Sequence, residues 1–170
     1  MRTNRRIGIA AAALLAATVA AAAEPCPAHL FVIARSKNAN IVVYDARRGS
    51  SGDLDPANPV EAYWLLDGKE GAREEMNRIE RQRAYGFDIA PASEAGTWEL
   101  TFKAGGKRRP RIRLRDGCPA AILPIGGKDA VLRRIFIQSK EGIFQPTVQY
   151  VELFGDDLAT GEPRYEKFTP

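Results

Sequence analysis

Residues 97–103 read Thr-Trp-Glu-Leu-Thr-Phe-Lys, and this stretch gives the clearest indication of the fold. Its apolar side chains, Trp98, Leu100 and Phe102, occupy every second position, and polar side chains fill the positions between them. Successive side chains of a β-strand point to opposite faces of the sheet. The pattern therefore predicts a strand with one buried face and one solvated face.

Much of the remaining chain shows similar patterns. Short apolar or alternating runs, which are typical of strands, lie at residues 30–34, 41–44, 60–66, 87–89, 111–115, 120–123, 131–138, 147–154 and 164–168. The turns between consecutive runs are too short for a helical crossover, which favours antiparallel pairing. Residues 36–40, Ser-Lys-Asn-Ala-Asn, predict a hairpin turn in which asparagine takes the left-handed conformation.

One helix is expected over about residues 70–84. Ala72, Met76 and Ile79 would lie on its buried face, and Gly86 would follow as a stop. Many short strands with one amphipathic helix predict a mainly β fold. It would be either a single antiparallel β-sandwich or a partly closed β-barrel, and the sequence does not choose between the two.

The first 23 residues have the composition of a secretory signal peptide. Three arginines precede an apolar run at residues 7–22, and Ala21-Ala22-Ala23 supplies the small residues that signal peptidase prefers. The run is rich in alanine and weakly hydrophobic, which argues against a retained membrane span. We therefore expect cleavage before Glu24 and a periplasmic or secreted bacterial protein, in which residues 24–170 form a single β-rich domain.

The charge balance changes once this leader is set aside. The whole chain has 25 Lys and Arg against 21 Asp and Glu, a formal net charge of +4. Three of those arginines lie in the leader, which leaves 22 basic against 21 acidic groups. Nucleic-acid binding depends on a strong positive excess. We therefore expect no nucleic-acid partner, and no transmembrane segment in the mature chain.

The two cysteines, Cys26 and Cys118, are expected to form a disulfide, because an even pair in an oxidising compartment is usually bonded. The alternative is a catalytic thiol at Cys118, which needs a base, and His29 is the only histidine in the chain. One histidine and two bonded cysteines make a poor ligand set for a transition metal. We predict no catalytic residue, no cofactor and no metal site.

Two groups of polar residues are candidate ligand-binding sites. Arg111, Arg113 and Arg115 alternate with apolar residues, which places three guanidiniums on one strand face about 6–7 Å apart. Such a row could bind the phosphate or carboxylate groups of an anionic envelope component or of a partner protein. A solvated face paired with acids on a neighbouring strand, such as Glu61 or Glu99, would also explain the row.

The second group, Arg35, Lys37 and Asn38, lies at the tip of the predicted hairpin of residues 30–44. Binding residues often occupy such loops. Asparagine and lysine are also what a tight exposed turn requires, so a structural role is open for this group as well.

Three stretches taken together resemble a known family. They are Phe31-Val32-Ile33 with Arg35-Ser36-Lys37-Asn38 and Asn40, then Asn58-Pro59-Val60 with Tyr63-Trp64, and then Asn77, Ile79 and Glu80 with Ala84-Tyr85-Gly86-Phe87. The combination resembles the uncharacterised bacterial family called domain of unknown function 4833, from about Leu30 to the C-terminal strand pair. The resemblance implies an exported single domain, and it brings no activity, cofactor or catalytic residue with it.

Three functions fit these observations. The first is a non-catalytic periplasmic module that binds an envelope component or a protein partner. The second is a carboxylate-dependent hydrolase acting on a glycan or lipid, which predicts two acids in a concave pocket, one of them with a raised pKa. The third is a β-barrel carrier of an apolar ligand, which needs an internal cavity in place of a filled core.

Overall fold

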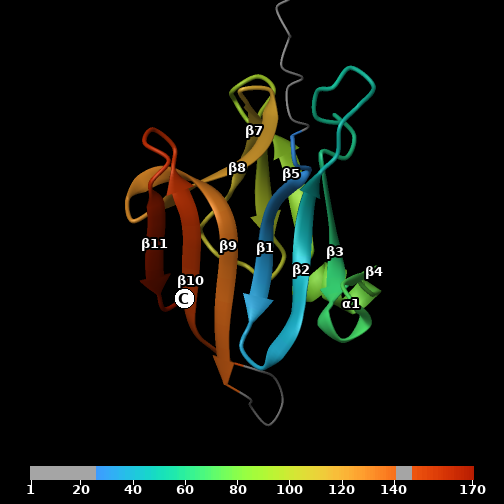
Figure 1. The fold of residues 1–170 in the computed structure, drawn as a ribbon, viewed down its shortest axis with the longest axis vertical. Helices are drawn as coiled ribbons and strands as arrows, with labels where there is room; N and C mark the ends of the chain where they lie inside the picture. Colours follow the sequence, from blue (N-terminus) through green and yellow to red (C-terminus); the bar gives the residue numbers. More distant parts are fainter. Residues whose placement is uncertain (1–25, 141–146) are drawn as a thin grey trace, which may run out of the picture.

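The computed structural model describes residues 26–140 and 147–170, which are mainly β (Figure 1). The predicted signal peptide, residues 1–23, lies outside the described residues. The strands are β1 (His29–Arg35), β2 (Asn38–Ala46), β3 (Val60–Leu66), β4 (Ala72–Glu74), β5 (Phe87–Pro91), β6 (Trp98–Phe102), β7 (Arg111–Arg115), β8 (Cys118–Ile125), β9 (Lys128–Lys140), β10 (Thr147–Asp157) and β11 (Pro163–Phe168). Within the described residues, no helix has the length and apolar composition needed to cross a membrane.

These strands form one sheet that folds back on itself at β9. The strand order is β4-β3-β2-β1-β9-β8-β7-β6-β5, and β10 pairs with β9 and with β11. Residues 128–131 of β9 pair with β8, whereas residues 134–137 pair with β1. The strands from β4 to β1 therefore lie in front of β5 to β7 (Figure 1). The end strands β4 and β5 are not paired with each other, so the predicted mainly β fold is confirmed as an open sheet.

One pairing differs from the expectation of antiparallel strands throughout. β1 and β9 are parallel, with Ile33 beside Ile135, while the other pairings are antiparallel. The expectation concerned strands that follow each other through a short turn. β1 and β9 are separated by seven other strands, and that length of chain allows β9 to return in the same direction.

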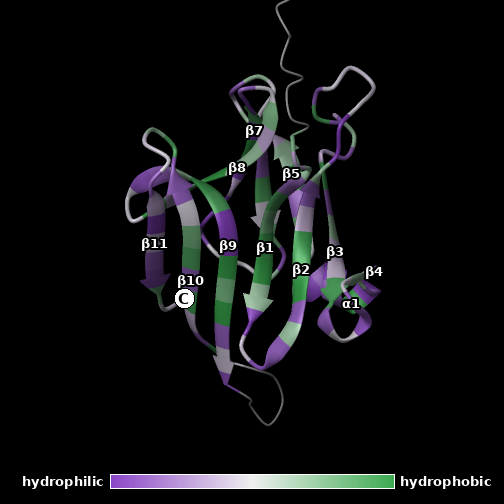
Figure 2. Cartoon of the chain, viewed as in Figure 1, coloured by the Kyte–Doolittle hydropathy of each residue, from purple (hydrophilic) through white to green (hydrophobic). Residues whose placement is uncertain are grey.

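The core lies between the two layers of the folded sheet. Leu100, on the apolar face of the strand that the sequence marked most clearly, has no exposed surface. The ring of Phe31 stacks on that of Tyr44 with 4.5 Å between centroids, and Phe102 meets both rings edge-on. Figure 2 shows blocks of apolar residues separated by polar residues along β9. The hydroxyl of Tyr44 donates to the carbonyl of Tyr85 at 2.5 Å, and burial raises the pKa of Tyr44.

The predicted helix exists but is much shorter than expected. Helix α1 spans only Arg78–Arg83, and Ala72–Glu74 form strand β4 beside β3. Asn77 begins the helix, because its side chain accepts the backbone N–H of Glu80 while the Glu80 carboxylate accepts the N–H of Asn77. Ile79, which the prediction placed on a buried face, is 70% exposed.

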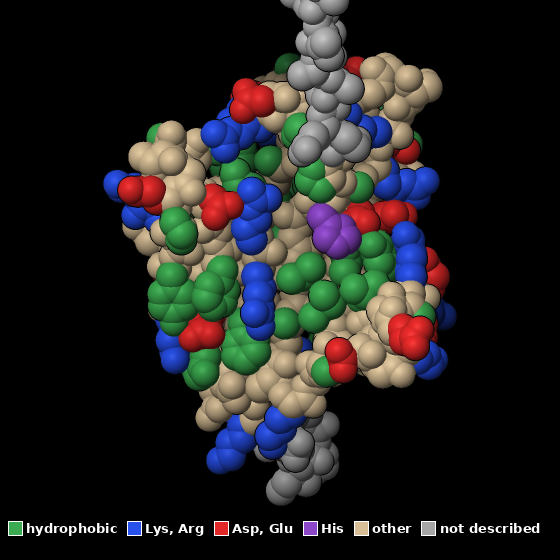
Figure 3. Space-filling model, viewed as in Figure 1, with side chains coloured by type: hydrophobic (Ala, Val, Ile, Leu, Met, Phe, Trp, Pro, Cys, Tyr) green, Lys and Arg blue, Asp and Glu red, His purple; other side chains and the backbone are tan. Residues whose placement is uncertain are grey.

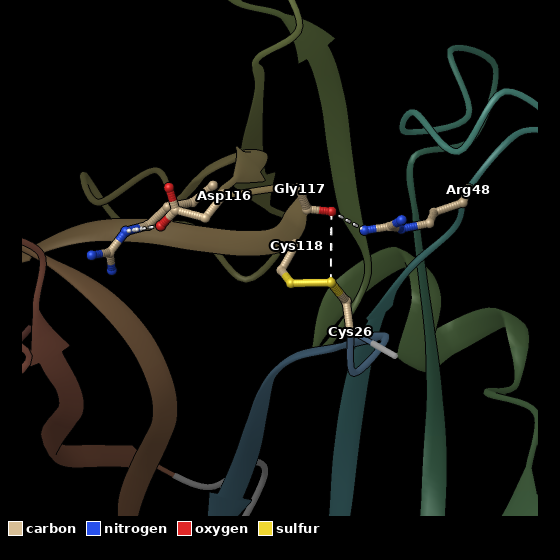
Figure 4. Close-up of a disulfide and its surroundings, with 6 residues drawn as sticks. Cys26, Arg48, Asp116, Gly117 and Cys118 are labelled. Atoms are coloured by element: carbon tan, nitrogen blue, oxygen red, sulfur yellow. Dashed lines mark hydrogen bonds and ion pairs between the residues drawn. A yellow bond between two sulfur atoms is a disulfide. The ribbon is translucent and has the colours of Figure 1, made fainter. Parts of the chain in front are cut away.

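Cys26 and Cys118 form the expected disulfide, with their Cα atoms 5.3 Å apart. The bond joins the segment before β1 to the first residue of β8, next to the turn between β7 and β8 (Figure 4). Arg48, from the loop between β2 and β3, donates to the carbonyl of Gly117 in the same turn at 2.5 Å. Three segments that are far apart in the sequence therefore meet at the end of the molecule where β1 begins.

Asp157 holds the turn between β10 and β11. Its buried carboxylate accepts the backbone N–H groups of Thr160 and Ala159 at 3.0 and 2.9 Å, and Arg164 donates to it at 2.6 Å. These hydrogen bonds stabilise the charged form, which lowers the pKa of Asp157 from 3.8 to about 2.

Asp157 should therefore make the stability of the protein depend on acid pH. A lowered native-state pKa stabilises the fold above the unfolded-state pKa, and this contribution is lost as the pH falls from about 4 to about 2. We expect Asp157→Asn to lower the urea midpoint at pH 7 and to flatten the decline between pH 4 and pH 2. The matched control is Asp156→Asn, because Asp156 pairs with the exposed Arg133 and should change the midpoint little. Equal midpoints for the two variants at pH 7 would contradict this assignment.

Candidate functional site

A pocket of about 250 Å³ opens between the two layers near the end of β1. We call it the apolar pocket. Its walls come from most parts of the sheet and are largely aliphatic or aromatic: Ile33 on β1, Phe102 on β6, Leu123 on β8, Ile135 and Ile137 on β9, Val148, Val151 and Leu153 on β10, and Phe168 on β11.

Strand register makes the floor of this pocket continuous. Ile135 and Ile137 are two residues apart on β9 and therefore point to the same face. Ile135 pairs with Ile33 on one side and with Leu153 on the other, and Ile137 pairs with Val151. Five apolar side chains from three neighbouring strands thus lie side by side.

The rim of the apolar pocket includes basic side chains. Lys107 and Arg108, from the loop between β6 and β7, both line it. Arg108 is held by two hydrogen bonds to Glu166 and lies 4.5 Å from the centre of the Phe168 ring, so it belongs to the wall. The hydrogen bonds from Arg108 lower the pKa of Glu166. Lys107 forms no ion pair with a described residue.

Tyr85 lies at the same rim, just after helix α1. Its side chain is 5% exposed, and its ring packs edge-on against Trp64 with 4.9 Å between centroids. The guanidinium of Arg35 lies 5.6 Å from the centre of the Tyr85 ring. Burial raises the pKa of Tyr85, and the charge of Arg35 opposes that shift. The Tyr85 hydroxyl forms no hydrogen bond with a described residue.

The Asp and Glu side chains of the described residues lie outside the lining of the apolar pocket. None of the residues lining the apolar pocket is Asp or Glu. Glu61 and Glu75 line a second, polar pocket of about 460 Å³ between β3 and β5, but Arg73 bonds to both of them. The pKa values of Asp157 and Glu166 are lowered, whereas a general acid needs a raised one. The hydrolase alternative therefore draws no support from the apolar pocket.

The histidine belongs to a cluster that the sequence did not reveal. His29 Nδ1 lies 2.5 Å from Asp45 Oδ1, a contact that is a hydrogen bond when Nδ1 carries the proton. The hydroxyl of Tyr63 donates to Asp45 Oδ2 at 2.8 Å, and burial together with this bond raises the pKa of Tyr63 to about 12. The cluster ties β1, β2 and β3 together on the outer face of the sheet, where Figure 3 shows the histidine beside acidic side chains. No free cysteine occurs among the described residues, so none of them places a thiol nucleophile beside His29.

No group of three or more His, Cys, Asp or Glu that could hold a metal ion is found within residues 26–140 and 147–170.

The predicted arginine row lies on β7, where each guanidinium has an acidic neighbour. The pairs are Arg111–Asp129 at 2.6 Å, Arg113–Glu94 at 2.7 Å and Arg115–Asp116 at 3.5 Å. Glu61 and Glu99, the acids we had considered as partners, bond instead to Arg73 and Arg109. Anion binding by this row stays a prediction, and an anion would have to compete with these acids.

The residues of the second predicted group, Arg35, Lys37 and Asn38, lie in two different environments. The turn lies where expected, but Lys37 takes the left-handed conformation, with φ 61°, in place of an asparagine. Asn38 already begins β2, and its side-chain oxygen accepts the N–H of Asn40 at 3.0 Å. Arg35 instead contacts Tyr85 at the apolar pocket.

The structure does not bring the two predicted groups together. Arg115 pairs in register with Cys118, beside the disulfide. The hairpin tip lies at the other end of β1. Among the predicted site residues, Arg35 contacts a side chain that lines the apolar pocket, the Tyr85 ring.

The comparisons with known proteins identify the family of the chain. The family model described as Domain of unknown function (DUF4833) matches residues 31–167, a span that includes nearly all of the sheet and most walls of the apolar pocket. No curated protein and no solved structure matched the chain. The predicted resemblance is confirmed, and the chain belongs to the family of domain of unknown function 4833.

Proposed function

We propose that this chain is an exported, non-catalytic binding module that accepts the apolar part of a ligand in the apolar pocket. The observation that carries the proposal is the pocket itself, whose described walls are mostly hydrophobic and include no Asp or Glu side chain. Ligand sites in proteins are commonly concave and apolar, with a few polar groups that orient the ligand.

The partial exposure of the pocket walls supports a binding role. Protein interiors are normally close-packed, yet Ile137, Val151 and Phe168 are only half-buried and Val148 is 41% exposed. A ligand that covers these side chains removes apolar area from water, which favours binding by about 25 cal/mol for each Å² buried. Contiguous exposed apolar surface of this kind commonly marks a binding site.

Export is supported by two independent observations. The leader sequence has the features of a signal peptide, and the Cys26–Cys118 disulfide suits an oxidising compartment such as the periplasm. An envelope component with an alkyl chain is a ligand of matching chemistry in that compartment. The apolar pocket favours it over a protein partner.

The experiment that tests this function measures binding of a neutral fluorescent apolar probe, N-phenyl-1-naphthylamine. We expect the wild type to bind the probe and Val151→Trp to weaken binding at least tenfold, because the indole would fill the pocket beside Ile137. The matched control is Val32→Trp, since Val32 lies on the same sheet but on the face of β1 opposite Ile33. It should bind like the wild type.

The proposal fails if the wild type does not bind the probe, or if Val151→Trp binds it as the wild type does. Thermal unfolding of all three proteins shows that any loss of binding is not a loss of folding.

A further inference from the structure

Resting on this proposed function, we infer that the ligand is an amphipathic anion whose alkyl chain fills the apolar pocket and whose carboxylate or phosphate head binds Arg35 and Tyr85. The inference concerns the polar end of the pocket, where the described residues offer the donors of Arg35 and Tyr85 and no Asp or Glu lines the wall.

Arg35 lies where the apolar floor ends. It pairs with Ile137 on β9 and follows Ile33 by two residues on β1, so it continues the face that lines the pocket. The side chain is half-buried and packs over the Tyr85 ring. A guanidinium carries five N–H donors in a planar fork that matches a carboxylate or phosphate. None of these donors has an acceptor among the described residues.

Tyr85 supplies a second donor without a partner. Its side chain is 95% removed from solvent and lines the pocket, and its hydroxyl has no hydrogen-bond partner among the described residues. The hydroxyl oxygen itself keeps some contact with solvent, so a ligand can reach it from the open pocket. The position of Tyr85 is fixed from two sides, because Tyr44 donates to its carbonyl and Trp64 packs on its ring. A ligand oxygen would therefore meet a donor that is already in place.

The charge around the pocket favours a negative head. Its described lining includes the side chains of Lys107 and Arg108 and no Asp or Glu, Glu166 pairs with Arg108, and the nearest acid that acts on the pKa of Tyr85 is Glu80, outside the lining. Lys107 and Arg35 remain as two positive charges without a carboxylate among the described residues. An ammonium head would be repelled by this arrangement, and a neutral hydroxyl would gain little from it.

The test compares ligands that share one alkyl chain and differ in the head. Octanoate, octyl phosphate, 1-octanol and octylamine displace the neutral probe from the wild type and from Arg35→Met and Tyr85→Phe. Arg134→Met is the matched control, because the Arg134 guanidinium also lies 5.6 Å from a ring, that of Phe136, but on the outer face of the sheet. We expect the wild type to bind octanoate or octyl phosphate at least tenfold more tightly than octanol, and octylamine most weakly.

The variants locate the head. Arg35→Met should reduce the preference for the anion to less than threefold, through a loss of affinity for octanoate and octyl phosphate that is larger than any change in octanol affinity. Tyr85→Phe should reduce the preference by severalfold, and Arg134→Met should retain it. The comparison of octanoate with octyl phosphate distinguishes a carboxylate ligand from a phosphate ligand.

Two failures can be told apart. If octanol binds the wild type as tightly as both octanoate and octyl phosphate, or if Arg35→Met keeps the preference, the anionic head is wrong and the pocket remains a ligand site. If neither the probe nor any octyl compound binds, the proposed function fails and this inference fails with it.

Discussion

Replacing both Cys26 and Cys118 by serine is expected to lower the free energy of unfolding by roughly 2–5 kcal/mol. The disulfide links residues 92 positions apart in the sequence. The chain-entropy model gives roughly 4–5 kcal/mol for a loop of that length, because the bond removes many conformations from the unfolded chain. A domain of this size has a total stability of about 5–15 kcal/mol, so this one bond contributes a large part of it.

Urea unfolding of the oxidised wild type, the reduced wild type and the double serine variant measures this effect. The matched control is Arg48→Met, which removes the hydrogen bond to the Gly117 carbonyl and leaves the disulfide intact. It should cost about 1 kcal/mol. The folded fraction of the double serine variant should still bind the apolar probe, because the pocket lies near the far end of β1. Identical midpoints for the serine variant and the wild type would show that the disulfide does not stabilise the domain.

Strand positions could be predicted because alternation is a local signal. The predicted strand at residues 60–66 is β3, and that at 111–115 is β7. The return of β9 beside β1 could not be predicted in the same way, because the pattern within a strand does not identify its partner strand. Which of them become neighbours depends on how the whole sheet folds back, and no short window of sequence contains that information.

The helix error has a local cause and a non-local one. Asn77 and Glu80 carry a capping signal that places the helix start after residue 76, and this signal was available in the sequence. Strand β4 had no such signal, since Ala72–Glu74 are exposed and show no alternation of burial. These residues are extended because the edge of β3 offers them backbone hydrogen bonds.

The candidate site was only partly predictable. Ile135 and Ile137 lie in a run that predicts a buried strand face. The run does not predict that the opposite layer leaves Ile137 partly exposed. Arg35 was a candidate as part of a hairpin tip, whereas its importance comes from the contact with Tyr85, fifty residues later in the chain. That contact exists only because β1 and the segment after α1 meet at the same end of the sandwich.

The segment that carries Tyr85 depends on the glycine that follows it. The N–H of Gly86 bonds to the carbonyl of Glu80 at 3.2 Å, and its carbonyl accepts the N–H of Lys103 at 2.8 Å. A Cβ atom at this position would lie 1.5 Å from the carbonyl oxygen of Arg81. We had expected Gly86 as a helix stop, and the structure shows that lack of space is what requires a glycine here.

Gly86→Ala is therefore expected to lower the free energy of unfolding by about 3 kcal/mol or more, at the upper end of the range for overpacked positions. The obstructing atoms are backbone, so the methyl group can be accommodated only if the end of helix α1 moves away from β6. That movement would take Tyr85 with it and break the hydrogen bond from Tyr44. Binding of the apolar probe should weaken along with stability.

Gly49→Ala is the matched control for this substitution. A Cβ atom at Gly49 has no neighbour within 4 Å, so the same chemical change should leave the urea midpoint and probe affinity close to those of the wild type. If Gly86→Ala also left both unchanged, the chain after α1 would have to tolerate displacement without disturbing Tyr85. The pocket would then not depend on the fixed position of that ring, and the preorganised donor that we assign to Tyr85 would lose its structural basis.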